Sequence, residues 1–509
     1  MLVKIILLLL FFGCMIGVGL YARKSTSSTN DFVLGGRNVG PWLSAFAYGT
    51  SYFSAVVFVG YAGQFGWKYG LASTWIGLGN AVLGSLLAWV AMGRRTRVMT
   101  HHLEVATMPD FFGKRYDSNV IKITASVIAF VFLIPYTASV YNGLSRLFGM
   151  AFDIPYTVCV VTMAVLTGIY VILGGYMATA INDFIQGIIM LVGIVAVIGA
   201  VLSGQGGFLE AVRKLSEIPS DVPVTMGQQG AFASFFGTDP LNLLGVIILT
   251  SLGTWGLPQM VHKFYAIKSE RAIKTGTIVS TFFAVIVSGG CYFLGGFGRL
   301  FDSEALYKAD GTVLYDAVVP TMLATLPDIL IGIVIVLVLS ASMSTLSSLV
   351  LTSASTLTLD FLKGNLVKDM DDKKQLIYIR VLIVFFIVLS VVLALNPPTF
   401  IAQLMGISWG ALAGAFLAPF LYGLYWKGVT KAGVWASFIC GVGITVSNMF
   451  LKFIASPINA GAVAMIAGLI VTPLVSLVTP KLEKQFLGKI FMCYDNTVNV
   501  SKKEYLKED

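Results

Sequence analysis

Hydroxyl side chains gather in one apolar stretch of the sequence, between residues 340 and 356. The stretch begins with Ser340-Ala-Ser-Met-Ser-Thr-Leu-Ser-Ser348 and continues with Thr352, Ser353, Ser355 and Thr356. In a helix, one face would carry Ala341, Ser344, Thr345 and Ser348. Neutral hydroxyl and carbonyl oxygens suit a small monovalent cation that must later be released. A purely structural role is the alternative, because such hydroxyls also bond to the preceding helical turn and hold helices together.

Two other apolar stretches are interrupted by small and polar residues. The first carries Gly49, Thr50, Ser51 and Ser54 in its middle, and the second reads Thr250-Ser-Leu-Gly-Thr-Trp-Gly-Leu-Pro258. Helices broken in this way expose backbone groups that can bind ions and solutes inside a membrane. Close packing of helices through small residues is the simpler explanation of either stretch taken alone.

Asp183 is the only acidic residue that the sequence places well inside an apolar stretch. It follows Asn182 and stands three positions before Gln186, a pattern that can cap the start of a helix. A carboxylate at this depth can also bind a cation or carry a proton. The residue pattern alone leaves both interpretations open.

The composition excludes most other classes of protein. The 509 residues are 57% hydrophobic and only 12% charged, whereas soluble domains are about 25% charged. The five cysteines lie far apart and are expected to be packing residues. The sequence has no phosphate-binding loop or H-E-x-x-H zinc motif. Its G-x-S-x-G match at 406–410 lies in an apolar stretch, so a membrane enzyme is not expected.

Thirteen apolar stretches are long enough to cross a membrane as helices. Their limits are about 3–22, 42–67, 71–92, 119–149, 155–175, 181–202, 240–262, 274–298, 328–359, 375–395, 399–425, 431–453 and 460–479. The interrupted stretches are the second and the seventh, so spans 2–6 and 7–11 form two groups of five. This correspondence favours an inverted-repeat transporter domain over residues 1–480, with repeats at about 42–202 and 240–425.

The segments outside the spans predict orientation. Residues 203–239 are expected to form an outer loop with a short surface helix, and 481–509 a charged, partly disordered cytoplasmic tail. With the N-terminus outside, 26 of the 34 lysines and arginines fall on the inner side and eight on the outer side. Because cytoplasmic segments are rich in these residues, we expect a multi-pass plasma-membrane protein with its C-terminus in the cytoplasm. The net charge of +9 then reports orientation, and no nucleic-acid partner is expected.

These motifs resemble the sodium:solute symporter family, which includes bacterial carriers of proline, pantothenate, sialic acid and galactose. The resemblance covers about residues 3–480. It rests on Asp31-Phe-Val-Leu-Gly-Gly-Arg37, Gly174-Gly-Tyr-Met-Ala-Thr-Ala-Ile-Asn-Asp-Phe-Ile-Gln-Gly187, Gly256-Leu-Pro258 and Met343-Ser-Thr-Leu-Ser-Ser348. The family implies an all-α, leucine-transporter-like fold, in which a 5+5 inverted repeat follows one extra helix and precedes two.

The resemblance also implies where ions bind. A first sodium site would use the backbone carbonyls of Thr50, Phe53 and Ala341 and the hydroxyls of Ser344 and Thr345. Sialic acid carriers have a second sodium site, and its residues match Asp183, Ser344, Ser347 and Ser348 of this chain. Sodium is therefore the expected coupling ion, and the residues are compatible with two sodium ions per solute.

The solute is expected to be a small carboxylate or zwitterion such as pantothenate or proline. Proline carriers have an aspartate where Tyr52 stands, and a tryptophan and a tyrosine at Thr250 and Thr254, although Tyr136 matches them. Span 2 and Gly256-Leu-Pro258 look more like the pantothenate carriers. Val57 replaces a glutamine of the galactose carriers, which argues against a sugar. The residues expected to line the pocket are Tyr52, Val57, Tyr136, Thr254 and Trp255.

The expected activity is sodium-coupled import by alternating access in the lipid bilayer, without an obligatory protein partner. Proton coupling through Asp183 is an alternative. A membrane-embedded sensor is a remote alternative, because the tail after residue 480 is too short for a kinase domain.

Overall fold

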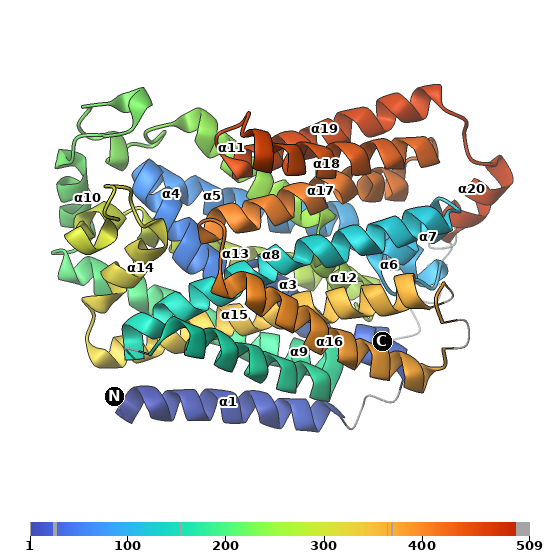
Figure 1. Cartoon of the computed structure of the whole chain (residues 1–509), viewed down its shortest axis with the longest axis horizontal. Helices are drawn as coiled ribbons and strands as arrows, with labels where there is room; N and C mark the ends of the chain where they lie inside the picture. Colours follow the sequence, from blue (N-terminus) through green and yellow to red (C-terminus); the bar gives the residue numbers. More distant parts are fainter. Residues whose placement is uncertain (1, 24–27, 153, 364, 368–369, 495–509) are drawn as a thin grey trace, which may run out of the picture.

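The protein is described by a computed structural model that covers residues 2–23, 28–152, 154–363, 365–367 and 370–494. In these residues the regular structure is helical, and the helices form one bundle (Figure 1). At one end of the bundle lie the start of α1 (Leu2–Arg23), α10 (Phe208–Glu217) and α14 (Tyr315–Ala324). At the other end lie α6 (Arg94–His102), α7 (Met108–Arg115) and α20 (Lys484–Phe491).

Two long helices, α15 (Asp328–Thr356) and α17 (Ile401–Tyr425), lie at the centre of the bundle. Their most apolar windows are 78% and 89% buried, because the faces of both helices carry apolar or small uncharged residues. Around them stand α3 (Pro41–Tyr52), α8 (Asn119–Phe152), α9 (Tyr156–Gly204), α13 (Glu270–Gly295), α16 (Asp372–Leu395), α18 (Lys431–Leu451) and α19 (Pro457–Val478). The central α15 packs against α9, α8 and α3, and α17 packs against α8, α18 and α19.

The remaining helical segments are short. Those before α7 are α2 (Thr29–Leu34), η1 (Gly35–Arg37), η2 (Val56–Tyr61), α4 (Ala62–Tyr69), η3 (Gly70–Ser73), α5 (Thr74–Gly79), η4 (Asn80–Leu87) and η5 (Trp89–Gly93). Those after α9 are η6 (Pro223–Thr225), η7 (Ala231–Ala233), α11 (Pro240–Leu252), η8 (Gly253–Gly256), α12 (Pro258–Tyr265), η9 (Gly298–Phe301), η10 (Glu304–Leu306), η11 (Leu357–Leu362) and η12 (Met492–Tyr494).

The number of membrane crossings agrees with the thirteen predicted spans. Ten helical stretches in the described residues are long and apolar enough to cross, and the bent pair α11–α12 makes eleven. Two of the ten, at 56–102 and 156–204, contain 47 and 49 residues. At 1.5 Å per residue each would extend about 70 Å, more than twice the hydrocarbon thickness. Each therefore crosses twice, which adds the remaining two spans.

A single glycine allows the chain to reverse within α9. Gly175 has φ +56°, a conformation that residues with a Cβ rarely adopt, and an added Cβ would lie 2.7 Å from the Phe32 carbonyl oxygen. Both arms of α9 contact the same part of α1. Gly19 of α1 lies against Tyr170 of the first arm, and the Met15 carbonyl accepts a bond from Asn182 of the second arm. Gly70, with φ +60°, lies between α4 and α5.

The two predicted helix breaks are present at equivalent positions. In the second span α3 ends at Tyr52, and Phe53 is extended, with φ −112° and ψ 106°. In the seventh span Leu257 is extended and Pro258 begins α12, which is bent by 47° from α11. A residue before proline avoids the helical conformation, and proline lacks the N–H that a continuous helix needs. The sequence therefore dictates the second break directly.

Other predictions have mixed outcomes. The surface helix predicted in 203–239 is confirmed as α10. In the tail, residues 484–491 form α20, and 495–509 lie outside the described residues. Asp183 remains the only acid well inside a predicted span, but a second buried acid lies at the end of one. Asp360, at the end of the α15 span, is 1% exposed, accepts a hydrogen bond from Thr107 at 2.6 Å and lies 3.6 Å from the Lys122 ammonium.

Candidate functional site

The break after α3 leaves carbonyl groups that turn toward α15. The last helical hydrogen bond at this end runs from the Phe53 N–H to the Gly49 carbonyl. The Thr50 carbonyl accepts instead from the hydroxyls of Ser344 and Thr345, at 3.1 and 3.4 Å. Backbone oxygen is thus available here because the helix stops, and the hydroxyls of α15 reach it because they face α3.

The same two hydroxyls also point back at their own helix. Ser344 and Thr345 lie 3.2 and 3.1 Å from the Ala341 carbonyl oxygen, and Thr345 is 3.3 Å from the Ser51 carbonyl. One hydroxyl proton cannot satisfy several acceptors at these distances, so the bonds are long and shared. Four of the five residues predicted for the first sodium site are therefore brought together, and Phe53 stands at the break itself.

This group of oxygens fits a sodium ion by its chemistry. The members are buried, neutral and contributed by two helices, with Thr50, Ser344 and Thr345 all fully buried. A small hard cation prefers hydroxyl and carbonyl oxygen, and a site without a carboxylate binds it weakly enough to allow release. The hydroxyl hydrogens can rotate away so that the lone pairs face an ion.

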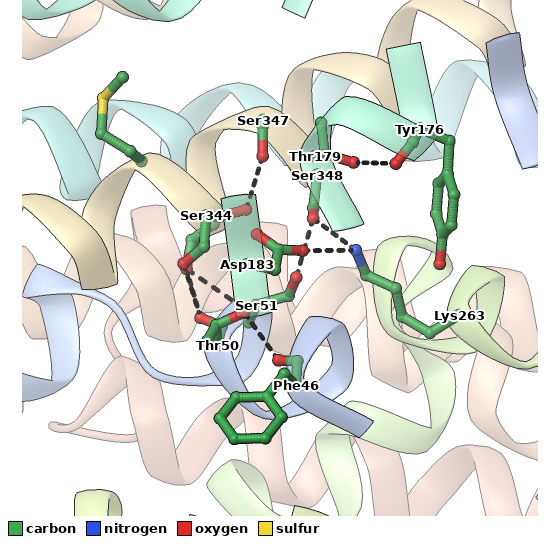
Figure 2. Close-up of polar contacts among 12 residues, drawn as sticks. Phe46, Thr50, Ser51, Tyr176, Thr179, Asp183, Lys263, Ser344, Ser347 and Ser348 are labelled. Carbon is green, nitrogen blue, oxygen red and sulfur yellow. Dashed lines mark hydrogen bonds and ion pairs between the residues drawn. The ribbon is translucent and has the colours of Figure 1, made fainter. Parts of the chain in front are cut away.

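A second polar group lies beside the first, around Asp183. The Asp183 side chain is fully buried on the second arm of α9. Its Oδ2 atom lies 3.6 Å from the Nζ atom of Lys263 on α12, and Lys263 is 2% exposed. The ammonium donates to the Ser348 hydroxyl at 2.8 Å, and Ser348 shares a 2.8 Å hydrogen bond with Ser51. Figure 2 shows Lys263 pointing between Asp183 and Ser348.

The other two serines predicted for a second sodium site point elsewhere. The Ser347 hydroxyl donates to the Ser344 carbonyl at 2.9 Å, within α15. The Ser344 hydroxyl belongs to the group at Thr50. Of the four predicted residues, only Asp183 and Ser348 share a partner, and that partner is Lys263.

Asp183 is also not a helix cap. It lies inside the second arm of α9, eight positions after the reversal at Gly175. Both carboxylate oxygens lack a hydrogen bond of ordinary geometry to any described residue. The capping interpretation is therefore wrong, and the carboxylate is held by charge.

Lys263 is the main residue that sequence reasoning missed. The predicted seventh span ends at residue 262, which leaves Lys263 in an inner loop. The available signal was Pro258, since a proline in the first turn starts a new helix that carries residue 263 inward. The neighbouring His262 is also buried, and its ring lies 5.4 Å from that of Tyr176.

The residues predicted to line a solute pocket are all buried, and two of them lie beside one tryptophan. The rings of Tyr52 and Tyr136 lie 6.2 and 5.8 Å from that of Trp409 on α17. An added Cβ at Gly253, at the second break, would lie 3.1 Å from the same indole. The Thr254 hydroxyl donates to the Ser251 carbonyl. Trp409 therefore contacts both breaks, and the sequence analysis did not include it.

The other two predicted pocket residues lie nearby. The Trp255 indole donates to the Leu83 carbonyl at 3.0 Å. Val57 is buried in η2, directly after the first break. Two polar atoms in this region lack a hydrogen bond of ordinary geometry to a described residue, namely the Tyr136 hydroxyl and the Trp409 indole nitrogen. Both can donate to an anionic or carbonyl group.

Known proteins resemble this chain in sequence. The sequence profile of the sodium:solute symporter family matches residues 32–441. Sodium/proline symporters of Staphylococcus aureus, for example from strains JH9 and COL, are 30% identical over 504 residues, covering 94% of this chain and 93% of theirs.

Two solved structures are similar in fold. The substrate-bound, outward-open structure of a Na+-coupled sialic acid symporter superimposes with a TM-score of 0.77 at 17% identity, covering 94% of this chain and 98% of that one. The closed structure of Mhp1, a nucleobase-cation-symport-1 family transporter, gives a TM-score of 0.51 at 14% identity, covering 90% and 97%.

Proposed function

The chain belongs to the sodium:solute symporter family, and on that premise we propose that it imports a small carboxylate or zwitterion together with sodium. The observation that carries the proposal is the approach of the Ser344 and Thr345 hydroxyls to the Thr50 carbonyl at the break of α3. Sodium binds there to these oxygens and to the carbonyls of Ala341 and Phe53. The ion holds the broken helix in the conformation that completes the solute pocket.

The direction of transport follows from the sodium gradient. The N-terminus is outside and the C-terminus is in the cytoplasm. Sodium enters from outside, the two repeats at about 42–202 and 240–425 rock against each other, and ion and solute leave inward. Each positive charge that moves inward gains about 2.3 kcal/mol per 100 mV of membrane potential.

The solute pocket lies between the two breaks, where Tyr52, Val57, Tyr136, Thr254 and Trp255 are joined by Trp409. The free donors of Tyr136 and Trp409 support a solute with a carboxylate or a carbonyl group. Proline is the first candidate, since sodium/proline symporters are among the relatives. Pantothenate is the second, because the motif at Gly256-Leu-Pro258 resembles its carriers.

Proton coupling through Asp183 receives less support than sodium coupling. A proton carrier has to exchange its proton with water, whereas Asp183 is fully buried and faces the Lys263 ammonium at 3.6 Å. A neighbouring positive charge favours the ionised carboxylate. Uptake measured against pH at fixed sodium separates the two mechanisms.

The test uses the purified chain in proteoliposomes with labelled proline and labelled pantothenate. Uptake is expected with an inward sodium gradient and not when choline replaces sodium. Ser344→Ala combined with Thr345→Ala is expected to lower the apparent sodium affinity at least about tenfold, because two ligands are lost. The matched control is Ser355→Ala with Thr358→Ala, whose hydroxyls donate to their own helix at 2.6 and 2.8 Å. Uptake that is equal in sodium and choline contradicts the proposal.

A further inference from the structure

Asp183 is a buried carboxylate with one cationic neighbour in the described part of the chain. It is fully buried, and neither of its oxygens accepts a hydrogen bond of ordinary geometry. The Lys263 Nζ atom, at 3.6 Å from Oδ2, is the cation in ion-pair contact with it. A buried carboxylate needs a compensating positive charge. In this structure the chain itself supplies that charge.

Lys263 is held in place by groups from two other helices, α15 and α9. Its ammonium donates to the Ser348 hydroxyl of α15 at 2.8 Å and faces Asp183 of α9 at 3.6 Å. It also lies 5.1 Å from the centre of the Tyr176 ring, on the same α9, in a cation–π contact. With 2% of its side chain exposed, Lys263 has no access to water that would replace these partners.

The ammonium therefore uses the oxygens that a second sodium ion would need. Asp183 and Ser348 are the members of the predicted second sodium site that face a common centre, and Lys263 lies at that centre. A sodium ion and an ammonium group carry the same charge, so both cannot share one carboxylate without strong repulsion. Binding of sodium here would require Lys263 to leave a position that is closed on every side.

We propose that Lys263 is a built-in cation that replaces a second sodium ion, so that the protein carries one sodium ion per solute. The inference rests on the proposed function, because it assumes that the one transported ion binds at Thr50, Ser344 and Thr345. A cation attached to the chain cannot be released inside with the solute. Lys263 thus compensates the negative charge of Asp183 throughout the transport cycle, and no ion is transported from this position.

The test counts bound sodium on the purified full chain with radioactive sodium, at saturating concentration and without solute. Wild type is expected to bind one ion per chain. Lys263→Met keeps the length of the side chain but removes its charge, so Asp183 is expected to recruit sodium and the count rises to two. Asp183→Asn combined with Lys263→Met removes both charges and returns the count to one. Lys4→Met removes a lysine whose carboxylate partner, Asp328, is 72% exposed and therefore solvated by water; it is the control, and its count stays at one.

Three results would overturn the inference. These are two ions on the wild type, one ion on a folded Lys263→Met variant, or two ions on the double variant. If Lys263→Met does not fold, the inference is tested on a chain that keeps Lys263 and carries Ser344→Ala and Thr345→Ala. The number of sodium ions bound to this variant is then measured. The count falls to zero if Lys263 occupies the second position, and to one if sodium does. A wild type that binds no sodium rejects the proposed function as well, so the two failures are distinguishable.

Discussion

The Lys263 ammonium and the Asp183 carboxylate face each other at 3.6 Å, each from a helix of a different predicted repeat. Both side chains are almost completely buried. Removing one partner of such a pair leaves an uncompensated charge, which typically costs 3–5 kcal/mol, whereas removing both costs much less. The contact is therefore a strong energetic link between α9 and α12, and its two members should behave as one unit in stability measurements.

A double-mutant cycle tests this link. We expect Asp183→Asn and Lys263→Met each to lower the free energy of unfolding by about 3–5 kcal/mol, and the double variant to be more stable than either single variant. Thermal melting in detergent, at fixed sodium, provides the comparison. Losses in the two single variants that simply add in the double variant would show that the pair is not coupled. Addition of sodium should raise the melting temperature of Lys263→Met more than that of the wild type.

The free donors in the solute pocket provide a second prediction. Tyr136→Phe removes one hydroxyl that has no hydrogen bond of ordinary geometry to the described chain, so its loss should cost little in stability. If that hydroxyl binds the solute, the KM for labelled proline or pantothenate should rise about tenfold, since a hydrogen bond to a charged group contributes about 1.5–3 kcal/mol. The apparent sodium affinity should stay unchanged. A change in sodium affinity with an unaltered solute KM would place Tyr136 outside the pocket.

Close packing between Tyr52 and the third span provides a third prediction. A Cβ added at Gly84 would lie 2.1 Å from the Tyr52 hydroxyl oxygen, which donates to the Thr250 carbonyl at 2.5 Å. Gly84→Ala should therefore displace the Tyr52 ring and raise the solute KM at least about tenfold. The matched control is Gly289→Ala in α13, where an added Cβ meets no atom within 4 Å. Equal uptake kinetics in the two variants would contradict the assignment of Tyr52 to the pocket.

A buried acid outside the spans predicts a dependence of stability on pH. Burial raises the pKa of Asp316, in α14, to about 6, although a hydrogen bond from the Ile401 N–H opposes the shift. The folded chain then holds a proton that the unfolded chain has already lost, so stability should fall as pH rises from about 4 to about 6. The rise of the Asp316 pKa from its ordinary value of 3.8 to about 6 corresponds to about 3 kcal/mol of stability.

Asp316→Asn tests this dependence, because asparagine can still accept from Ile401 and cannot ionise. The stability of Asp316→Asn relative to wild type should increase between pH 4 and pH 7.5, measured as the difference in melting temperature. The opposite trend is expected for Asp310→Asn below about pH 4, because hydrogen bonds from Thr312 lower the pKa of Asp310 beneath its ordinary value of 3.8. Parallel pH profiles of wild type and Asp316→Asn would contradict the burial effect.

Much of the fold was predictable because the membrane imposes simple physical rules. Apolar length predicted the spans, and Pro258 and the small residues around Gly49 predicted the two breaks, since each removes or weakens a helical hydrogen bond. The meeting of Thr50 with Ser344 followed from these breaks and from the resemblance. In each case a local pattern determines the structure.

The partners of Asp183 were not predictable in the same way. Lys263 comes from the continuation of a broken helix, whose direction depends on the 47° bend at Leu257. Trp409 is one apolar residue among many, and only packing in three dimensions brings it to both breaks. Asp360 was placed outside a span because its depth depends on how far η11 extends α15. All three positions are decided by contacts between distant segments.

The reversal at Gly175 has a consequence for the order of events during synthesis. The two arms of α9 are joined without a loop, so they enter the bilayer together as a hairpin, and Asp183 enters with them. Lys263 is made about 80 residues later, which at a synthesis rate of about 5–20 residues per second is a delay of roughly 4–16 s. For that interval the carboxylate is in the membrane without its lysine. Until α12 has been made, the Asp183 carboxyl group must therefore be protonated or screened by other groups.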